Sequence, residues 1–185
     1  REWWTGQARR VLTALLHAAA LGGLQMRDVL AWVADPESSQ DEIVRLLGRS
    51  PQATAYIADT TQFLTTNDRT RSSITSSIMP ALGWLTNPAA AAAAEPGCGL
   101  DIADLIGRRA TVYLLAEQES QCAPLIAALT GAIAREARRL AARRPGGRLD
   151  PPLRLCLDEA ALLGPPLDSW TSDMGGRGVT IIAAF

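Results

Sequence analysis

Two adjacent carboxylates, Asp158 and Glu159, directly follow the apolar run Leu153-Arg-Leu-Cys-Leu157. A short apolar run of this kind is typical of a buried strand. Acidic residues at the carboxyl end of a parallel strand lie at the edge where open α/β sheets bind ligands. In phosphoryl transfer, such an aspartate holds Mg²⁺, usually through water, and the next glutamate orients or deprotonates the attacking water. The run therefore predicts a Walker B strand, although strand-end surface acids give the same pattern.

The partner of a Walker B strand is a glycine-rich phosphate loop that ends in Lys-Ser or Lys-Thr. All 18 basic residues of this chain are arginine, so no such loop is present. Two interpretations stay open: either the acidic pair is unrelated to nucleotides, or the loop lies outside these 185 residues. In the second case we expect the chain alone to bind ATP poorly and not to hydrolyse it.

A second candidate is Arg177, which lies among glycines in the segment Gly175-Gly-Arg-Gly178. The glycines predict a tight turn between a helix and a strand, with the guanidinium displayed at the rim of the sheet. In ring ATPases an arginine in such a place completes the site of a neighbouring subunit. The alternative is an ordinary turn arginine in solvent.

The elements that would position these residues differ between the two halves of the chain. Up to Pro88 the apolar residues recur three and four apart, which predicts helices throughout. We expect these helices over about 3–21, 26–34, 39 or 40 to 47, 51–63, and 67 or 68 to 85. Residues 1–95 are therefore predicted to form an all-helical domain.

Beyond residue 95 short apolar runs alternate with helical patterns. Strands are predicted at 111–115, 153–157 and 179–185, with helices at about 122–144 and 167–173 between them. Strands that alternate with helices form a parallel sheet, because the connecting helix must cross over. The predicted fold class is therefore α/β, with residues 96–185 forming the sheet-containing part.

Composition narrows the class of protein further. The chain is 48% hydrophobic and 20% charged, which excludes a disordered or collagen-like chain, and its net charge of −1 gives no sign of a nucleic-acid-binding domain. No apolar run is long enough to cross a membrane, and no signal sequence follows Arg1. Three scattered cysteines indicate no disulfide framework, and the single histidine, His17, is expected to be packed without a metal.

Two other groups of residues have a structural interpretation. Four tryptophans lie in the predicted helices and are expected to anchor the core rather than stack on bases: Trp3, Trp4, Trp32 and Trp84. Arginines also form a stripe along the predicted 122–144 helix, which is expected to be a solvated face.

Taken together, these segments resemble the type IV secretion coupling proteins of the TraG/TraD class, the hexameric DNA-transfer ATPases of bacterial conjugation. The resemblance covers most of the chain. Residues 153–161 look like the family's Walker B strand, 147–152 like its lead-in, and 170–185 like the Gly-Arg-Gly segment and the next strand. Residues 4–20 and 69–74 look like the helical domain that this family inserts into its nucleotide-binding domain.

The resemblance implies a role for each candidate residue. Asp158 would be the Mg²⁺ aspartate, Glu159 the catalytic carboxylate and Arg177 the arginine finger. Residues 1–95 would be the inserted domain that faces substrate and partners, and residues 96–185 part of a RecA-like nucleotide-binding domain. Relative to the family pattern, the phosphate loop would precede Arg1, and the sensor glutamine would follow Phe185.

For the longer parent protein the resemblance implies ATP and Mg²⁺ as cofactors and a homo-hexamer as the assembly. Its partners would be DNA, relaxase and relaxosome proteins, and components of the secretion channel. Its place would be the bacterial cytoplasm, at the cytoplasmic face of the inner membrane. An alternative is a non-catalytic helical recognition module that binds relaxase, a relaxosome protein or DNA. A third interpretation is an unrelated helical scaffold.

Overall fold

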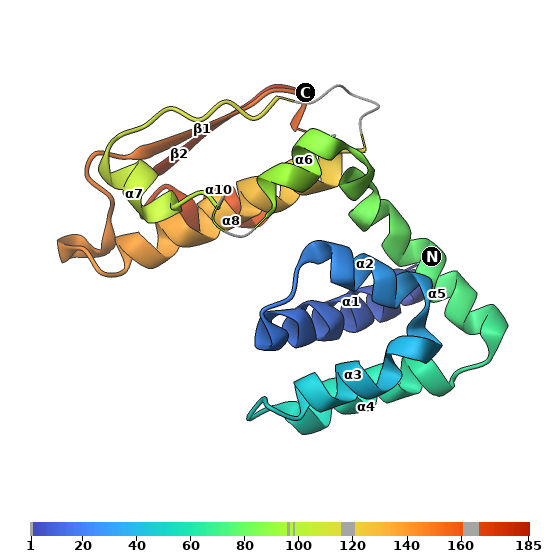
Figure 1. Ribbon diagram of the computed structural model, residues 1–185. Helices are drawn as coiled ribbons and strands as arrows, with labels where there is room; N and C mark the ends of the chain where they lie inside the picture. The colour runs from blue at the N-terminus through green and yellow to red at the C-terminus, as the bar shows by residue number, and fades with distance from the viewer. Residues whose placement is uncertain (1, 96, 98, 116–120, 161–166) are drawn as a thin grey trace. The chain divides into compact units, whose positions relative to one another are not determined.

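The computed structural model describes residues 2–95, 97, 99–115, 121–160 and 167–185, which form two compact units, 1–98 and 99–185 (Figure 1). The functional division at residue 95 stays a prediction. In the described residues of the first unit all regular elements are helices: α1 (Glu2–Gly22), α2 (Met26–Ala34), α3 (Pro36–Leu47), α4 (Ala53–Thr65), α5 (Asp68–Leu82), the 3-10 turn η1 (Gly83–Thr86) and α6 (Pro88–Ala93).

Helix α1 is the centre of the first unit and packs against α2, α3, α4 and α5. Its Leu15 is buried among residues of the surrounding helices, which include Val33, Leu47 and Ile78. The helical periodicity of residues 3–21 therefore predicted the existence of this helix correctly. Trp32 and Trp84 are buried as predicted.

Trp3 departs from the core prediction, because 58% of its surface is exposed. It lies in the first turn of α1. The side chain of Trp4 lies outside the described residues.

Helix α3 begins earlier than predicted because Asp35 serves two helices. Its backbone N–H ends α2 by donating to Ala31, and its side chain accepts from the N–H of Ser38 to begin α3. Pro36 then occupies the first turn of α3, where its missing N–H costs nothing. Asn87 likewise ends η1 and caps α6, and the helix expected to reach residue 85 is divided into α5 and η1 at Gly83.

Helix α4 begins later than expected. Gln52 is its N-cap residue, because residues 51–52 form a turn before the helix starts at Ala53. Ser50 still has a capping role, since its hydroxyl accepts the N–H of Gln52 at 3.1 Å.

The second unit combines helices with a small sheet. Its elements within the described residues are α7 (Ile102–Gly107), α8 (Ala123–Ala141), the 3-10 turn η2 (Pro145–Gly147), β1 (Leu153–Leu157), α10 (Leu167–Met174) and β2 (Val179–Ala183). Strands β1 and β2 pair in parallel, and Leu153 lies opposite Val179 while Leu157 lies opposite Ala183. These two strands and their parallel pairing confirm the prediction, and the mixed α/β class agrees with it.

The third predicted strand, 111–115, is wrong. These residues carry no strand assignment, and within the described residues the sheet has two strands. Tyr113 is 79% and Leu115 is 87% exposed, so the run is not buried either. A continuous apolar run indicates that a segment suits a sheet, but it does not specify a pairing partner. Helix α7 was not predicted, although the capping aspartate Asp101 marks its start.

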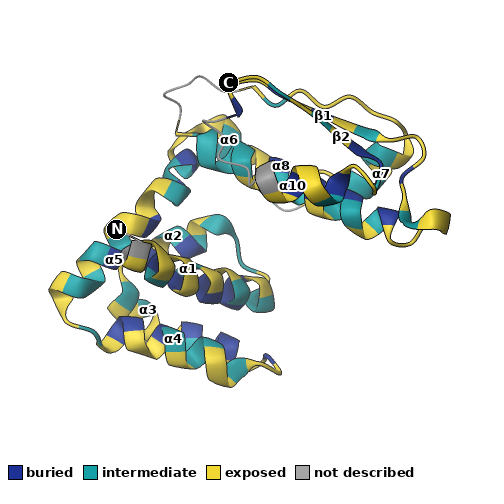
Figure 2. Ribbon diagram, turned by 180° about the vertical axis from the view of Figure 1, so that it is seen from behind, coloured by how far each residue is buried: buried dark blue, intermediate teal, exposed yellow. Residues whose placement is uncertain are grey.

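Helices α8 and α10 cover one face of the β1–β2 pair (Figure 1). Leu155 and Leu157 of β1 point into this core, where Ala137 of α8 and Met174 of α10 are buried. The alternate residues of both strands are exposed and include Arg154, Cys156, Thr180 and Ile182 (Figure 2). This alternation means that one face of the sheet is covered by the described helices.

Candidate functional site

The predicted acidic residues lie at the carboxyl end of β1. The residues on either side of them, Leu157 and Ala160, both form backbone hydrogen bonds with Ala184, which follows β2. The carbonyl of Leu157 accepts the N–H of Ala184 at 2.9 Å, and the N–H of Ala160 donates to the carbonyl of Ala184 at 2.8 Å. Asp158 and Glu159, together called the acidic tip, are therefore held between two fixed points and are both exposed.

The backbone of the acidic tip is strained. Glu159 has a φ of +48°, in the left-handed region that non-glycine residues adopt at a cost of about 1–2 kcal/mol. Among the described residues the other non-glycine residue with positive φ is Arg109, which directly follows the C-cap residue of α7, a position where this conformation is common. A strained conformation of this kind persists only where the surrounding structure holds it in place. Such conformations are concentrated at functional sites.

The acidic tip fits a hydrated magnesium ion. Asp158 Oδ1 accepts the N–H of Glu159 at 3.1 Å, which fixes the carboxylate and leaves its second oxygen without a partner among the described residues. Mg²⁺ is usually bound by one or two carboxylates together with waters and substrate phosphates. No cluster of three or more metal-ligating side chains occurs within the described part of the chain.

Arg177 lies at the other end of the sheet from the acidic tip. It precedes β2, whereas Asp158 and Glu159 follow β1, and the two strands are parallel. A strand of this length spans about 15 Å at roughly 3.3 Å per residue. The structure therefore does not bring Arg177 and Glu159 of one chain together.

Two neighbouring elements hold Arg177 through a shared carboxylate. Arg177 Nε donates to Asp173 Oδ1 at 2.9 Å, and Asp173 Oδ2 forms an ion pair with Arg138 Nη2 at 2.7 Å. These contacts join the end of α10 to α8 and to the turn before β2. The hydrogen bond from Arg177, followed by the contact with Arg138, holds the pKa of Asp173 below its ordinary value of 3.8.

The turn that carries Arg177 allows no side chain at its last position. Gly178 has a φ of +77°, and a Cβ placed there would lie 2.6 Å from the carbonyl oxygen of Leu149. The close approach arises because Leu149 donates its N–H to the Arg177 carbonyl at 2.9 Å, and Leu153 donates to the Gly178 carbonyl at 2.9 Å. Glycine is therefore required at position 178 for two reasons: the positive φ and the close approach of the Leu149 carbonyl oxygen.

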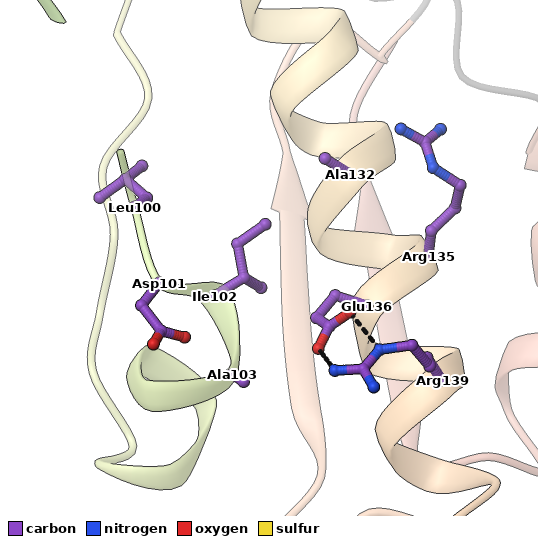
Figure 3. A pocket seen from close by; sticks show the side chains of 8 residues that line it. All are labelled: Leu100, Asp101, Ile102, Ala103, Ala132, Arg135, Glu136 and Arg139. Carbon is purple, nitrogen blue, oxygen red and sulfur yellow. Dashed lines mark hydrogen bonds and ion pairs between the residues drawn. The ribbon is translucent and has the colours of Figure 1, made fainter. Parts of the chain in front are cut away.

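A shallow pocket of about 640 Å³ lies between α8 and the residues at the start of α7 (Figure 3). Sequence reasoning missed it, because the arginine stripe of α8 was interpreted as a solvated face. Its lining residues are Leu100, Asp101, Ile102, Ala103, Ala132, Arg135, Glu136 and Arg139.

Two of the four charged residues that line this pocket, Glu136 and Arg139, neutralise each other. Arg139 Nε donates to Glu136 Oε2 at 2.6 Å, and a second contact joins Arg139 Nη2 to Glu136 Oε1. The hydrogen bonds from Arg139 lower the pKa of Glu136. Figure 3 shows the Arg135 guanidinium extending away from this pair, so the pocket does not surround a convergent group of polar atoms.

His17 is packed, as predicted. Its Nε2 lies 3.0 Å from the hydroxyl of Ser50, and its ring lies 4.5 Å from the ring of Tyr56, measured between centroids. The Ser50 hydroxyl also accepts the N–H of Gln52, and the tautomer of His17 decides which of the imidazole and the hydroxyl donates to the other. The contact joins α1 to the turn before α4.

No protein-family model, curated protein or solved structure matches this chain. The chemistry of the candidate residues therefore rests on their types and geometry. In the described residues no helix is both long enough and apolar enough to cross a membrane.

Proposed function

We propose that this chain is part of a conjugative coupling ATPase, in which ATP hydrolysis drives the transfer of DNA and relaxosome proteins through a type IV secretion system. The observation that carries the proposal is the acidic tip: two exposed carboxylates at the carboxyl end of a parallel strand, held on both sides by Ala184 and strained at Glu159. This is the edge at which open α/β sheets bind ligands.

The two carboxylates of the acidic tip have different tasks in this proposal. Asp158 would hold Mg²⁺ through its available oxygen, and the bound ion would supply positive charge to the phosphates of ATP. Glu159, displayed by its left-handed backbone, accepts a hydrogen bond from the attacking water and takes its proton. The phosphate-binding lysine comes from sequence outside these 185 residues, since the chain has none.

The remaining features of the proposal concern the assembly. Residues 96–185 belong to a RecA-like domain, and the helical first unit faces DNA, relaxase and relaxosome proteins. The parent protein acts as a homo-hexamer at the cytoplasmic face of the bacterial inner membrane. The self-contained core of the first unit supports a separate role for it, because its packing within the described residues needs no part of the sheet.

The test is Glu159→Gln in the complete ATPase that contains this chain. The change keeps the volume of the side chain and removes the proton acceptor, so hydrolysis should fall by about 10²–10⁴-fold while ATP binding persists. Asp104→Asn is the control, because Asp104 is an exposed acid of α7 that pairs with Arg108. Equal hydrolysis by Glu159→Gln and the wild type would overturn the proposal.

A second measurement uses the 185-residue chain itself. Without a phosphate loop, the acidic tip is expected to bind Mg²⁺ weakly and to produce no magnesium-dependent ATP turnover above background. Turnover by this chain that is abolished in Glu159→Gln would contradict the assignment of phosphate binding to other sequence.

A further inference from the structure

We propose that Asp173 is a positioning residue that holds Arg177 with its two terminal nitrogens presented to a phosphate on a second copy of this chain. The inference rests on the proposed function, because the phosphate is that of a nucleotide bound at the neighbour's acidic tip. It adds Asp173 and Arg138 to the residues on which hydrolysis depends.

The geometry of the Arg177–Asp173 contact leaves the terminal nitrogens available. Arg177 donates through Nε, at 2.9 Å from Asp173 Oδ1, and its Nη1 and Nη2 have no partner within the described residues. The Arg177 side chain is 38% exposed. A guanidinium held through Nε retains its planar pair of terminal nitrogens, which matches the geometry of phosphate oxygens.

Arg138 explains why Asp173 does not occupy those nitrogens as well. A carboxylate and a guanidinium tend to form two parallel hydrogen bonds, which would use one terminal nitrogen of Arg177. Here the second oxygen of Asp173 lies 2.7 Å from Arg138 Nη2, in an ion pair whose geometry is not that of a hydrogen bond. Each oxygen of Asp173 therefore has its own guanidinium, and Arg177 keeps both terminal nitrogens.

The backbone of Arg177 is fixed as firmly as its side chain. Its N–H donates to the Met174 carbonyl at 3.0 Å, and its carbonyl accepts from Leu149 at 2.9 Å. Gly178 then continues the chain in a conformation closed to any side chain. An arginine that is held both at its backbone and at its Nε loses little conformational freedom when it binds a phosphate. This favours a role in stabilising a transition state.

The phosphate must belong to another copy of the chain. The acidic tip of the same chain lies at the opposite end of the β1–β2 pair, about 15 Å away along the strands, which is beyond the reach of an arginine side chain. An Arg177 that contacts nucleotide phosphate can therefore do so only across an interface between subunits.

The first test measures the contact directly in the 185-residue chain, without nucleotide. The Arg177 Nε–H signal, assigned by its loss in Arg177→Lys, should exchange slowly with water by NMR. Asp173→Ala should accelerate this exchange at least tenfold, whereas Asp104→Ala, which removes an exposed acid with the same i, i+4 spacing to Arg108, should not. Equal exchange in the wild type and Asp173→Ala would overturn the inference.

The second test uses mixed rings of the complete ATPase. Asp173→Ala should lower kcat by about 10–100-fold with little change in the KM for ATP, because a misplaced arginine affects the transition state alone. Mixed with Glu159→Gln subunits, Asp173→Ala subunits should regain activity, since each supplies what the other lacks. Mixed with Arg177→Ala subunits, they should not, since both lack the same function.

The outcomes separate the two proposals. If Glu159→Gln has no effect on hydrolysis, the proposed function fails. If Glu159→Gln and Arg177→Ala abolish hydrolysis but Asp173→Ala and Asp173→Asn do not, the positioning role alone fails. Asp173→Asn keeps the shape of the side chain and removes its charge. If Asp173→Ala and Asp173→Asn both lose activity, and both regain it when mixed with Glu159→Gln subunits, then simple unfolding is excluded as the cause.

Discussion

Glu159 and Arg177 lie at opposite ends of one parallel strand pair. Glu159 lies two positions after the end of β1, and Arg177 lies two positions before the start of β2. The sequence predicts that each residue lies at a rim of the sheet. Because the two strands are parallel, Glu159 lies at the rim after the strands and Arg177 at the rim before them. A single chain therefore cannot combine the glutamate and the arginine in one site. If both act on ATP, the site must be shared between subunits.

The strain at Glu159 predicts that glycine at this position gives a more stable chain than alanine does. Glu159→Gly removes the cost of a left-handed backbone at φ +48° and should be more stable than Glu159→Ala by about 1 kcal/mol. Chemical denaturation of both variants measures the difference. As control, the same two substitutions at Glu136, which lies within α8, should give the opposite order, because glycine weakens a helix. Glu159→Ala as the more stable variant would contradict the strain.

Gly178 is predicted to tolerate no side chain. Gly178→Ala meets both an unfavourable φ of +77° and a carbonyl oxygen at 2.6 Å, and should lower the free energy of unfolding by more than about 2 kcal/mol. Gly146→Ala has φ +75° but open space, so it should cost about 1 kcal/mol from the backbone alone. Gly175→Ala, with neither constraint, should be nearly neutral. Equal stability of the three variants would show that the close approach at Leu149 is absent.

Arg71 is expected to stabilise the first unit through the end of α4. Its Nη1 donates to the Leu64 carbonyl at 2.9 Å, and its Nη2 forms ion pairs with Glu37 and Asp68. The Arg71 side chain is only 15% exposed, so Arg71→Ala should cost about 1–3 kcal/mol, mainly from the carbonyl left without a donor. Arg69→Ala, an exposed neighbour, should cost less than about 0.5 kcal/mol. Thermal unfolding compares the two, and similar losses would contradict the role of Arg71.

The pKa of Asp173 predicts how its contribution depends on pH. Because the hydrogen bond from Arg177 and the contact with Arg138 lower the pKa of this carboxyl in the folded chain, its stabilising effect is complete above the ordinary value of 3.8. The effect is then lost as the pH falls through the lowered folded value. The difference in unfolding free energy between wild type and Asp173→Asn should therefore be constant near neutral pH and shrink below pH 3.8. A difference that grows on acidification would contradict the assigned direction.

Local sequence determined most of the elements. The three-and-four spacing of apolar residues identified α1, α2 and α8, and the short apolar runs identified β1 and β2. These signals are strong because a helix or strand must bury one side, and its period is visible in the chain itself. Capping residues shared by two helices, such as Asp35, were harder to assign, because one side chain can end one helix and begin the next.

The chemistry of the candidate residues was visible in the sequence, but their arrangement was decided by the tertiary structure. Asp158, Glu159 and Arg177 stand out by type and by their glycine or apolar neighbours. Their separation at two ends of the sheet depends on strand pairing, which involves residues distant in the chain. The run 111–115 failed as a strand for the same reason, since its composition suits a sheet but does not choose a partner. The ion pair of Asp173 with Arg138 likewise exists only because packing brings α8 and α10 onto one face, whereas the Asp173–Arg177 pair joins residues only four apart in the sequence.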